Sequence, residues 1–182
     1  MNTDGNQLPL VSVIVPCFNV EWCLPTGMES LLGQEDVSFE VIAVDDGSTD
    51  NTRSILEELS NRHANLRVVS QANAGVSAAR NAGLDVSQGN WIAFFDPDDI
   101  VQNDWLASMV EACEGHHSDG CMCAYVEADA SHLDSGKRRD CEFAGFFLNH
   151  DSMLNELLPG VLGRSFADVD RDNRGGIFAM DT

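Results

Sequence analysis

Short apolar runs alternate along the chain with longer segments in which apolar residues recur at helical spacing. The runs are rich in valine, isoleucine and aromatic residues, as expected of strands that are covered on both faces. They occupy residues 10–15, 39–44, 66–69, 91–95 and 122–126. Helical spacing between them predicts helices at residues 21–32, 55–62, 76–84 and 105–113. This alternation predicts an α/β fold with an open, mostly parallel sheet and helices on both of its faces.

The same pattern divides the 182 residues into one domain and two flanking segments. Residues 1–8 are predicted to be an N-terminal extension, and the domain is predicted to span 9–160, with its clearest part at 9–127. Within the weaker part, we expect a strand at 142–148 and a short helix at 151–158. Residues 161–182 carry many charges and two adjacent glycines without a periodic apolar face, so we expect an irregular tail.

Acidic residues follow two of the predicted strands directly. Asp45 and Asp46 end the second, and Asp96, Asp98 and Asp99 surround a proline after the fourth. In open parallel sheets, ligands bind beyond the carboxyl ends of the strands. A hard divalent cation such as Mg²⁺ or Mn²⁺ takes oxygen ligands from one or two carboxylates and completes its shell with water and phosphate oxygens. The pattern therefore favours phosphate chemistry, and the alternative is a turn whose acids only cap the next helix.

The charge balance disfavours two classes of partner. Thirty acidic and ten basic residues give a net charge of -20, which disfavours non-specific attraction to nucleic acid or to an anionic membrane surface. Lys137 is the only lysine. An anionic ligand would have to be held by a metal ion, backbone N–H groups and a few arginines. The one basic run, at 137–139, is either a solvated loop or a contact for an acceptor or a membrane surface.

Other features point to a cytoplasmic location. No run of about 18 apolar residues is present, and the first six residues lack the positive and apolar regions of a signal peptide. The six cysteines form no C-x-x-C pair and no regular framework, so we expect reduced, mostly buried thiols. A zinc site is the minor alternative, and the three tryptophans are expected in the core.

Four motifs in order resemble those of the family 2 glycosyltransferases with the GT-A fold, which has a Rossmann-like nucleotide-binding half. The resemblance is specific over about residues 9–110 and fades through 160. Its motifs are Val11-Ser12-Val13-Ile14-Val15-Pro16-Cys17-Phe18-Asn19, Val44-Asp45-Asp46-Gly47-Ser48-Thr49-Asp50, Asn73-Ala74-Gly75-Val76-Ser77-Ala78-Ala79-Arg80-Asn81-Ala82-Gly83 and Phe95-Asp96-Pro97-Asp98-Asp99.

This resemblance implies a transferase that moves a sugar from a nucleotide-diphosphate sugar, a UDP-sugar by expectation, to a saccharide or lipid-linked acceptor. It implies inversion at the sugar carbon and a Mn²⁺ or Mg²⁺ cofactor that stabilises the departing diphosphate. For the location, peripheral contact at the inner face of the membrane is the alternative to a purely cytoplasmic protein.

The resemblance also assigns site residues. Asp98 is the expected direct metal ligand, and Asp96 is expected to reach the metal through water or to bind the ribose. Asp46 is expected to accept the imide N–H of uracil, while Asp45 can be structural. Arg80 can bind the diphosphate or pair with a strand-end carboxylate, and both can hold. The full set for the nucleotide sugar is Pro16, Phe18, Asn19, Glu21, Asp46, Asn73, Gly75, Arg80 and Asp96.

The general base is where this chain departs from the family pattern. An inverting transfer needs a group that deprotonates the acceptor hydroxyl, and no Glu-Asp type motif follows the acidic turn at a suitable distance. Weak candidates are Asp168, Asp170, Asp172 and Asp181. The alternative function is therefore a catalytically incomplete fragment that binds the nucleotide sugar. A receiver-type signalling domain and a nucleotidyltransferase fit less well, because the first needs a lysine at a later strand end and the second a glycine-rich basic loop after its first strand.

Overall fold

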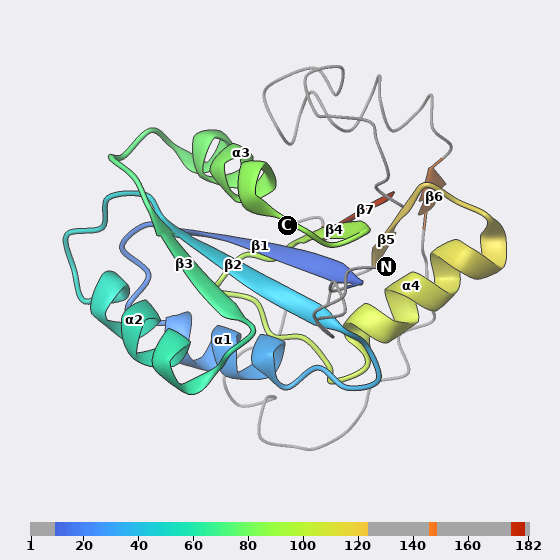
Figure 1. The fold of residues 1–182 in the computed structure, drawn as a ribbon, viewed down its shortest axis with the longest axis horizontal. Helices are drawn as coiled ribbons and strands as arrows, with labels where there is room; N and C mark the ends of the chain where they lie inside the picture. The colour runs from blue at the N-terminus through green and yellow to red at the C-terminus, as the bar shows by residue number, and fades with distance from the viewer. Residues whose placement is uncertain (1–9, 124–145, 149–175, 181–182) are drawn as a thin grey trace, which may run out of the picture.

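The computed structural model describes residues 10–123, 146–148 and 176–180. Helices lie on both faces of one twisted sheet (Figure 1). The strands are β1 (Val11–Cys17), β2 (Phe39–Asp45), β3 (Leu66–Ser70), β4 (Trp91–Phe94), β5 (Gly120–Cys123), β6 (Phe146–Leu148) and β7 (Gly176–Met180). The helices are α1 (Leu24–Leu32), α2 (Thr52–Arg62), α3 (Val76–Val86) and α4 (Trp105–His116).

The strands form a seven-stranded sheet in the order β3-β2-β1-β4-β7-β5-β6. All neighbouring pairs are parallel except β5 and β6. The chain proceeds from β1 outward through β2 to β3 and then returns to place β4 on the other side of β1. The strand order therefore reverses between β1 and β4, and such a reversal is where open α/β sheets bind their ligands.

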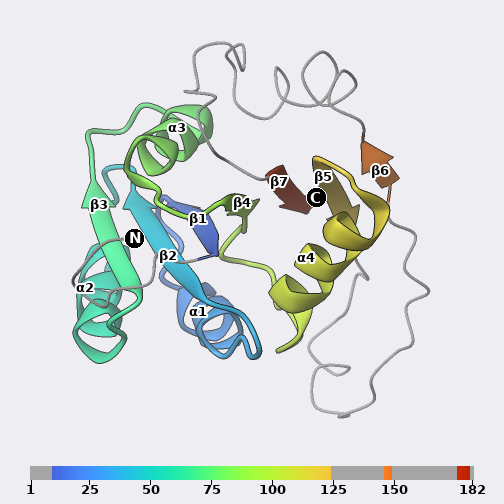
Figure 2. The same ribbon diagram turned by 45° about the vertical axis from the view of Figure 1, so that its right-hand side comes forward.

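Alternation along the central strands distributes their side chains between two layers. Val13 and Val41 belong to the large core that also contains residues of α1, α2 and α4. Ile42 and Val44 pack instead with Ala79 of α3. Successive residues of a strand point to opposite faces, so α1, α2 and α4 cover one face and α3 covers the other (Figure 2).

Strand β1 continues past Pro16, which we expected to end it. Pro16 pairs with Val44 of β2 in the register of the sheet, although proline lacks the N–H that a central strand normally donates. On the opposite side, the pairing of β1 with β4 ends at Ile14, whose carbonyl accepts the N–H of Phe95. Pro16 shares the parity of Ile14 and faces this unpaired side, so its missing N–H removes no bond from the ladder.

The C-terminal strands correct one expectation. Residues 176–180, which we expected in an irregular tail, form β7 between β4 and β5. The error came from requiring a periodic apolar face, because an inner strand of a parallel sheet commonly has a continuous apolar run instead. The strand expected at 142–148 appears as β6 at 146–148. The helix expected at 151–158 lies outside the described residues.

The other predicted elements are confirmed, with small shifts at their ends. Helix α1 begins at Leu24, later than expected, with Pro25 in its first turn, where proline is tolerated. The N-cap of α2 is Asn51, which makes no side-chain cap hydrogen bond, and the preceding Asp50 accepts the N–H of Thr52 with its Oδ1 at 2.9 Å. Within the described part of the chain, no helix has both the length and the apolarity to cross a membrane.

Candidate functional site

The candidate site lies at the carboxyl edge of β1, β2, β3 and β4, where the strand order reverses. Four connections meet there, namely residues 18–23 after β1, 46–51 after β2, 71–75 after β3 and 95–104 after β4. Every residue predicted to bind the nucleotide sugar or the metal falls in these connections, except Pro16, near the end of β1, and Arg80, on α3. The parallel register brings the ends of neighbouring strands together, as the sequence predicted.

The acidic turn after β4 is fixed at its base and exposed at its tip. Phe95 is fully buried and donates its N–H to Ile14 O at 3.1 Å, and the N–H of Asp99 closes the turn on Asp96 O at 3.0 Å. Pro97 is buried and Asp98 is exposed. No hydrogen bond joins the Asp98 carboxylate to another residue in the described ranges. This carboxylate is therefore available to a ligand.

Gly27 of α1 allows the acidic turn to pack closely against this helix. A Cβ at position 27 would overlap the carbonyl oxygen of Pro97 and lie 3.1 Å from that of Asp99. The backbone of α1 and the backbone of the acidic turn are thus in direct contact. A glycine that weakens the predicted helix is explained by this close approach.

Arg80 of α3 holds the first carboxylate of the turn. Its Nη2 donates to both oxygens of Asp96, at 3.0 and 3.3 Å, and its guanidinium lies 5.7 Å from the centre of the Phe94 ring. The salt-bridge alternative for Arg80 is therefore confirmed. Arg80 Nε is buried and has no hydrogen-bond partner among the described residues, so the guanidinium retains a donor.

Negative charge accumulates around the turn. Burial, followed by the charges of Asp98 and Asp96, raises the pKa of the Asp99 carboxyl. Burial and then the charge of Asp98 raise the pKa of the Cys23 thiol. In both cases the neighbouring carboxylates add to the effect of burial, and a cation would neutralise their charge. Within residues 10–123, 146–148 and 176–180, no cluster of three or more His, Cys, Asp or Glu side chains could enclose a metal ion.

A divalent cation fits this donor set. Mg²⁺ and Mn²⁺ are commonly held by one or two carboxylates together with water and substrate phosphates, without an all-protein cage. Asp98 supplies an exposed carboxylate, and Asp96 lies two residues away, held by Arg80. A metal bound there would act as a Lewis acid towards a diphosphate.

Asp46 lies behind the loop that follows β3. It is only 3% exposed, and its Oδ1 accepts the N–H of Ala74 at 2.9 Å and the side-chain amide of Gln71 at 2.7 Å. Its Oδ2 accepts the N–H of Gly75 at 2.8 Å. The loop is thereby fastened to the end of β2, with Asn73 and Gly75 exposed. Gly75 has a φ of 90°, which explains the glycine.

Asn19 and Glu21 join the connection after β1 to the one after β2. Asn19 Oδ1 accepts the N–H of Thr49 at 2.8 Å, and Glu21 Oε2 accepts that of Asn51 at 2.8 Å. Asn19 has a left-handed backbone, with φ 54°, which asparagine tolerates well. Both side chains therefore hold the edge of the site, and their predicted contact with the nucleotide stays a prediction.

Large apolar side chains are exposed around the same edge. Trp22 is 76% and Phe18 46% exposed in the connection after β1, while Val76 and Ile100 are about half exposed. Our expectation that Trp22 lies in the core is wrong, because it precedes α1 in the exposed connection after β1. Trp91 and Trp105 are buried as expected. An exposed aromatic edge suits a site that binds a flat ring.

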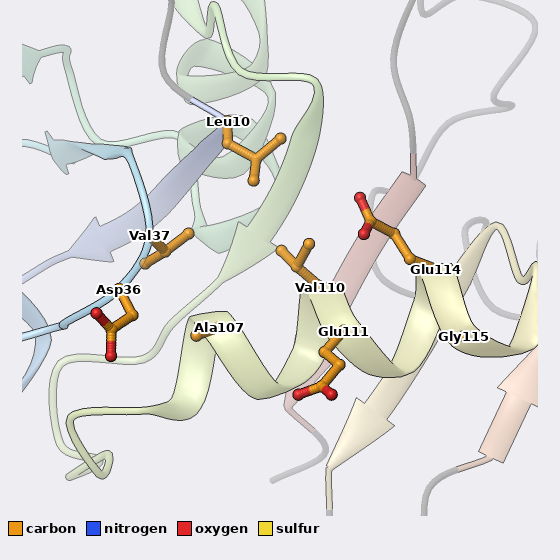
Figure 3. Close-up of a pocket in the computed structure, with 8 residues that line it drawn as sticks. All are labelled: Leu10, Asp36, Val37, Ala107, Val110, Glu111, Glu114 and Gly115. Atoms are coloured by element: carbon orange, nitrogen blue, oxygen red, sulfur yellow. The ribbon is translucent and has the colours of Figure 1, made fainter.

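A hollow of about 300 Å³ lies elsewhere, at the amino edge of the sheet beside α4 (Figure 3). Leu10, Val37 and Val110 give it an apolar wall, and Asp36, Glu111 and Glu114 are acidic side chains in its lining. None of the described residues that line it has a cationic side chain for a phosphate, and the hollow lies away from the strand ends that carry the motifs. This hollow is therefore not the candidate functional site.

A family model described as Glycosyl transferase family 2 matches residues 12–167. The chain belongs to this family. Its fold is GT-A, as its similarity to solved glycosyltransferase structures shows. Among curated relatives, the uncharacterized glycosyltransferase EpsJ of Bacillus subtilis strain 168 is 39% identical over 121 residues, which are 66% of this chain and 35% of EpsJ.

Two solved structures share the fold and carry nucleotide ligands. TarS of S. aureus in complex with UDP-GlcNAc has a TM-score of 0.59 and 33% identity, over 66% of this chain and 35% of that one. The mannosyltransferase PcManGT from Pyrobaculum calidifontis, in complex with GDP-Man and Mn²⁺, has a TM-score of 0.59 and 26% identity, over 66% and 36%. This glycosyltransferase chain thus spans about a third of the length of these proteins.

The structure brings most of the predicted site residues to one edge but does not test their roles. No sequence pattern pointed to Gln71 or Gly27 as part of the site, because their contacts are with residues 25 and more positions away. The candidates for the general base, Asp168, Asp170, Asp172 and Asp181, lie outside the described residues, as do the basic run 137–139 and Cys141. The five described cysteines are free thiols, four of them buried.

Proposed function

We propose that this glycosyltransferase binds a UDP-sugar with Mn²⁺ or Mg²⁺ and transfers the sugar, with inversion, to a saccharide or lipid-linked acceptor. The observation that carries the proposal is the acidic turn, in which an exposed Asp98 stands beside an Asp96 held by Arg80. The metal would be held by Asp98, with Asp96 nearby, and it would supply Lewis-acid stabilisation of the leaving diphosphate.

The remaining groups divide between the two ends of the nucleotide. Arg80 is held beside the acidic turn by Asp96, and its cationic guanidinium suits a phosphate oxygen as well. Phe18 is exposed at the same edge and can stack on a base. Asp46, Asn73 and Gly75 would form the base side. With a net charge of -20, the protein attracts a diphosphate only where a cation compensates locally.

A panel of nucleoside diphosphates tests this proposal. We expect UDP with Mn²⁺ to raise the melting temperature most, by roughly 5–10 °C at a hundred times its Kd, because such binding stabilises by about 2.7 kcal/mol and each kcal/mol shifts a domain of this size by about 2–4 °C. The measurement is thermal unfolding with Mn²⁺ alone and with UDP, GDP, CDP or ADP added. No shift beyond that of Mn²⁺ alone with any nucleotide would refute the proposal.

A further inference from the structure

The carboxylate of Asp46 is nearly saturated with hydrogen bonds. A carboxylate offers about four acceptor positions, two on each oxygen. In this structure, Oδ1 accepts two donors, the Gln71 side-chain amide and the Ala74 N–H, whereas Oδ2 accepts one, the Gly75 N–H. One acceptor position therefore remains, and it is on Oδ2.

Gln71 is fixed where it can fill the second position of Oδ1. It directly follows β3, and its own N–H donates to the carbonyl of Asp45 at 3.0 Å. Its amide must turn the nitrogen towards Asp46, because an ionised carboxylate only accepts. The loop cannot draw back easily on this side, since the backbone of Asn73 packs against Gly47, where a Cβ would lie 2.8 Å from Asn73 N.

Nucleobases differ in the hydrogen-bond donors that they present to such a carboxylate. Uracil presents one ring N–H between two carbonyl groups, and a single acceptor position satisfies it. Guanine presents a ring N–H beside an amino group, and this pair is best satisfied by both oxygens of one carboxylate. When both acceptor positions of Oδ1 are occupied, Asp46 can still accept the single ring N–H of uracil. One of the two guanine donors would then have no acceptor, which is costly in a desolvated site.

From these contacts we infer that Gln71 is a positioning residue that selects uracil over guanine by occupying Oδ1 of Asp46. The inference rests on the proposed function, because it requires the base to meet Asp46. The inference names the residue that determines which nucleotide is bound. The question arises because a protein with the same fold has been solved in complex with GDP-Man.

The test compares UDP and GDP affinities, measured by calorimetry with saturating Mn²⁺, for the wild-type chain and for Gln71→Met. The wild-type chain should prefer UDP, and Gln71→Met should lower the UDP-to-GDP affinity ratio by about tenfold, the effect of one charge-assisted hydrogen bond. Gln71→Ala, which adds no new side-chain bulk, should lower the ratio in the same direction. The matched control is Gln88→Met, at an exposed glutamine at the opposite edge of the sheet, which should leave the ratio unchanged.

Three results would overturn the inference. One is an unchanged ratio in both Gln71 variants, including the case in which both nucleotides weaken equally, since that result indicates a purely structural role. Another is a wild-type preference for GDP, which would leave metal-dependent nucleotide binding standing. The third is the absence of any nucleotide binding by the wild-type chain, which would remove the proposed function as well.

Discussion

Asp98→Asn is expected to weaken the binding of UDP in the presence of Mn²⁺ by about 100-fold. Loss of a group that only orients a metal ligand commonly lowers metal affinity 10- to 100-fold. Loss of a direct ligand should therefore lower it by about 100-fold or more. The substitution preserves the size of an exposed side chain, and the fold should be unaffected. Calorimetric titration of UDP with and without Mn²⁺ measures the effect.

The charge change alone would act in the opposite direction. Removing one acid from a chain with net charge -20 slightly favours any anionic ligand. Asp36→Asn is the matched control, because Asp36 is an exposed acid in the lining of the hollow at the amino edge. UDP affinity that falls equally in both variants, or in neither, would contradict the assignment of Asp98 as the metal ligand.

Gly27→Ala is expected to destabilise the fold and to weaken the binding of UDP with Mn²⁺. The new methyl group would overlap the carbonyl of Pro97, and overpacking of this kind costs about 1–3 kcal/mol. Alanine recovers only about 0.5–1 kcal/mol of that as a better helix former. The remaining strain displaces the acidic turn, and a shift of about 1 Å in a positioning group can cost up to 100-fold. Urea unfolding and calorimetry measure the two effects.

Gly115→Ala is the control for this substitution. Gly115 lies in α4, and a Cβ there would have no neighbouring atom within 4 Å. It should therefore stabilise the chain by about 0.5–1 kcal/mol and leave nucleotide binding unchanged. If Gly27→Ala also stabilised the chain and retained full affinity, the contact between α1 and the acidic turn would not position the site.

The sequence predicted those parts of the site that depend on local pattern. Asp46 and the acidic turn were predictable because each directly follows an apolar run, and parallel strands bring their carboxyl ends to one edge. From the sequence, Arg80 could bind the diphosphate, pair with a strand-end carboxylate, or do both. The structure shows the salt bridge, and a contact of Arg80 with the diphosphate stays a prediction.

Other features depend on contacts that no local pattern reveals. Gly27 lies against Pro97, and Gln71 reaches Asp46, and in each case the partners are far apart in the chain. The exposure of Trp22 could not be predicted from its residue type, because an aromatic side chain at the edge of a binding site and one in the core look alike in sequence. Strand β7 was missed because its run of apolar residues is short and lies among charges.

The most direct test of the account is to locate the metal on the wild-type chain. Mn²⁺ is paramagnetic and broadens the NMR signals of nearby amides. With UDP present, we predict broadening of the amides of Asp96, Asp98 and Asp99, with no effect on the acidic lining of the hollow beside α4. Broadening centred on Glu111 and Glu114, with the acidic turn unaffected, would contradict the assignment of the turn as the metal-binding part of the site.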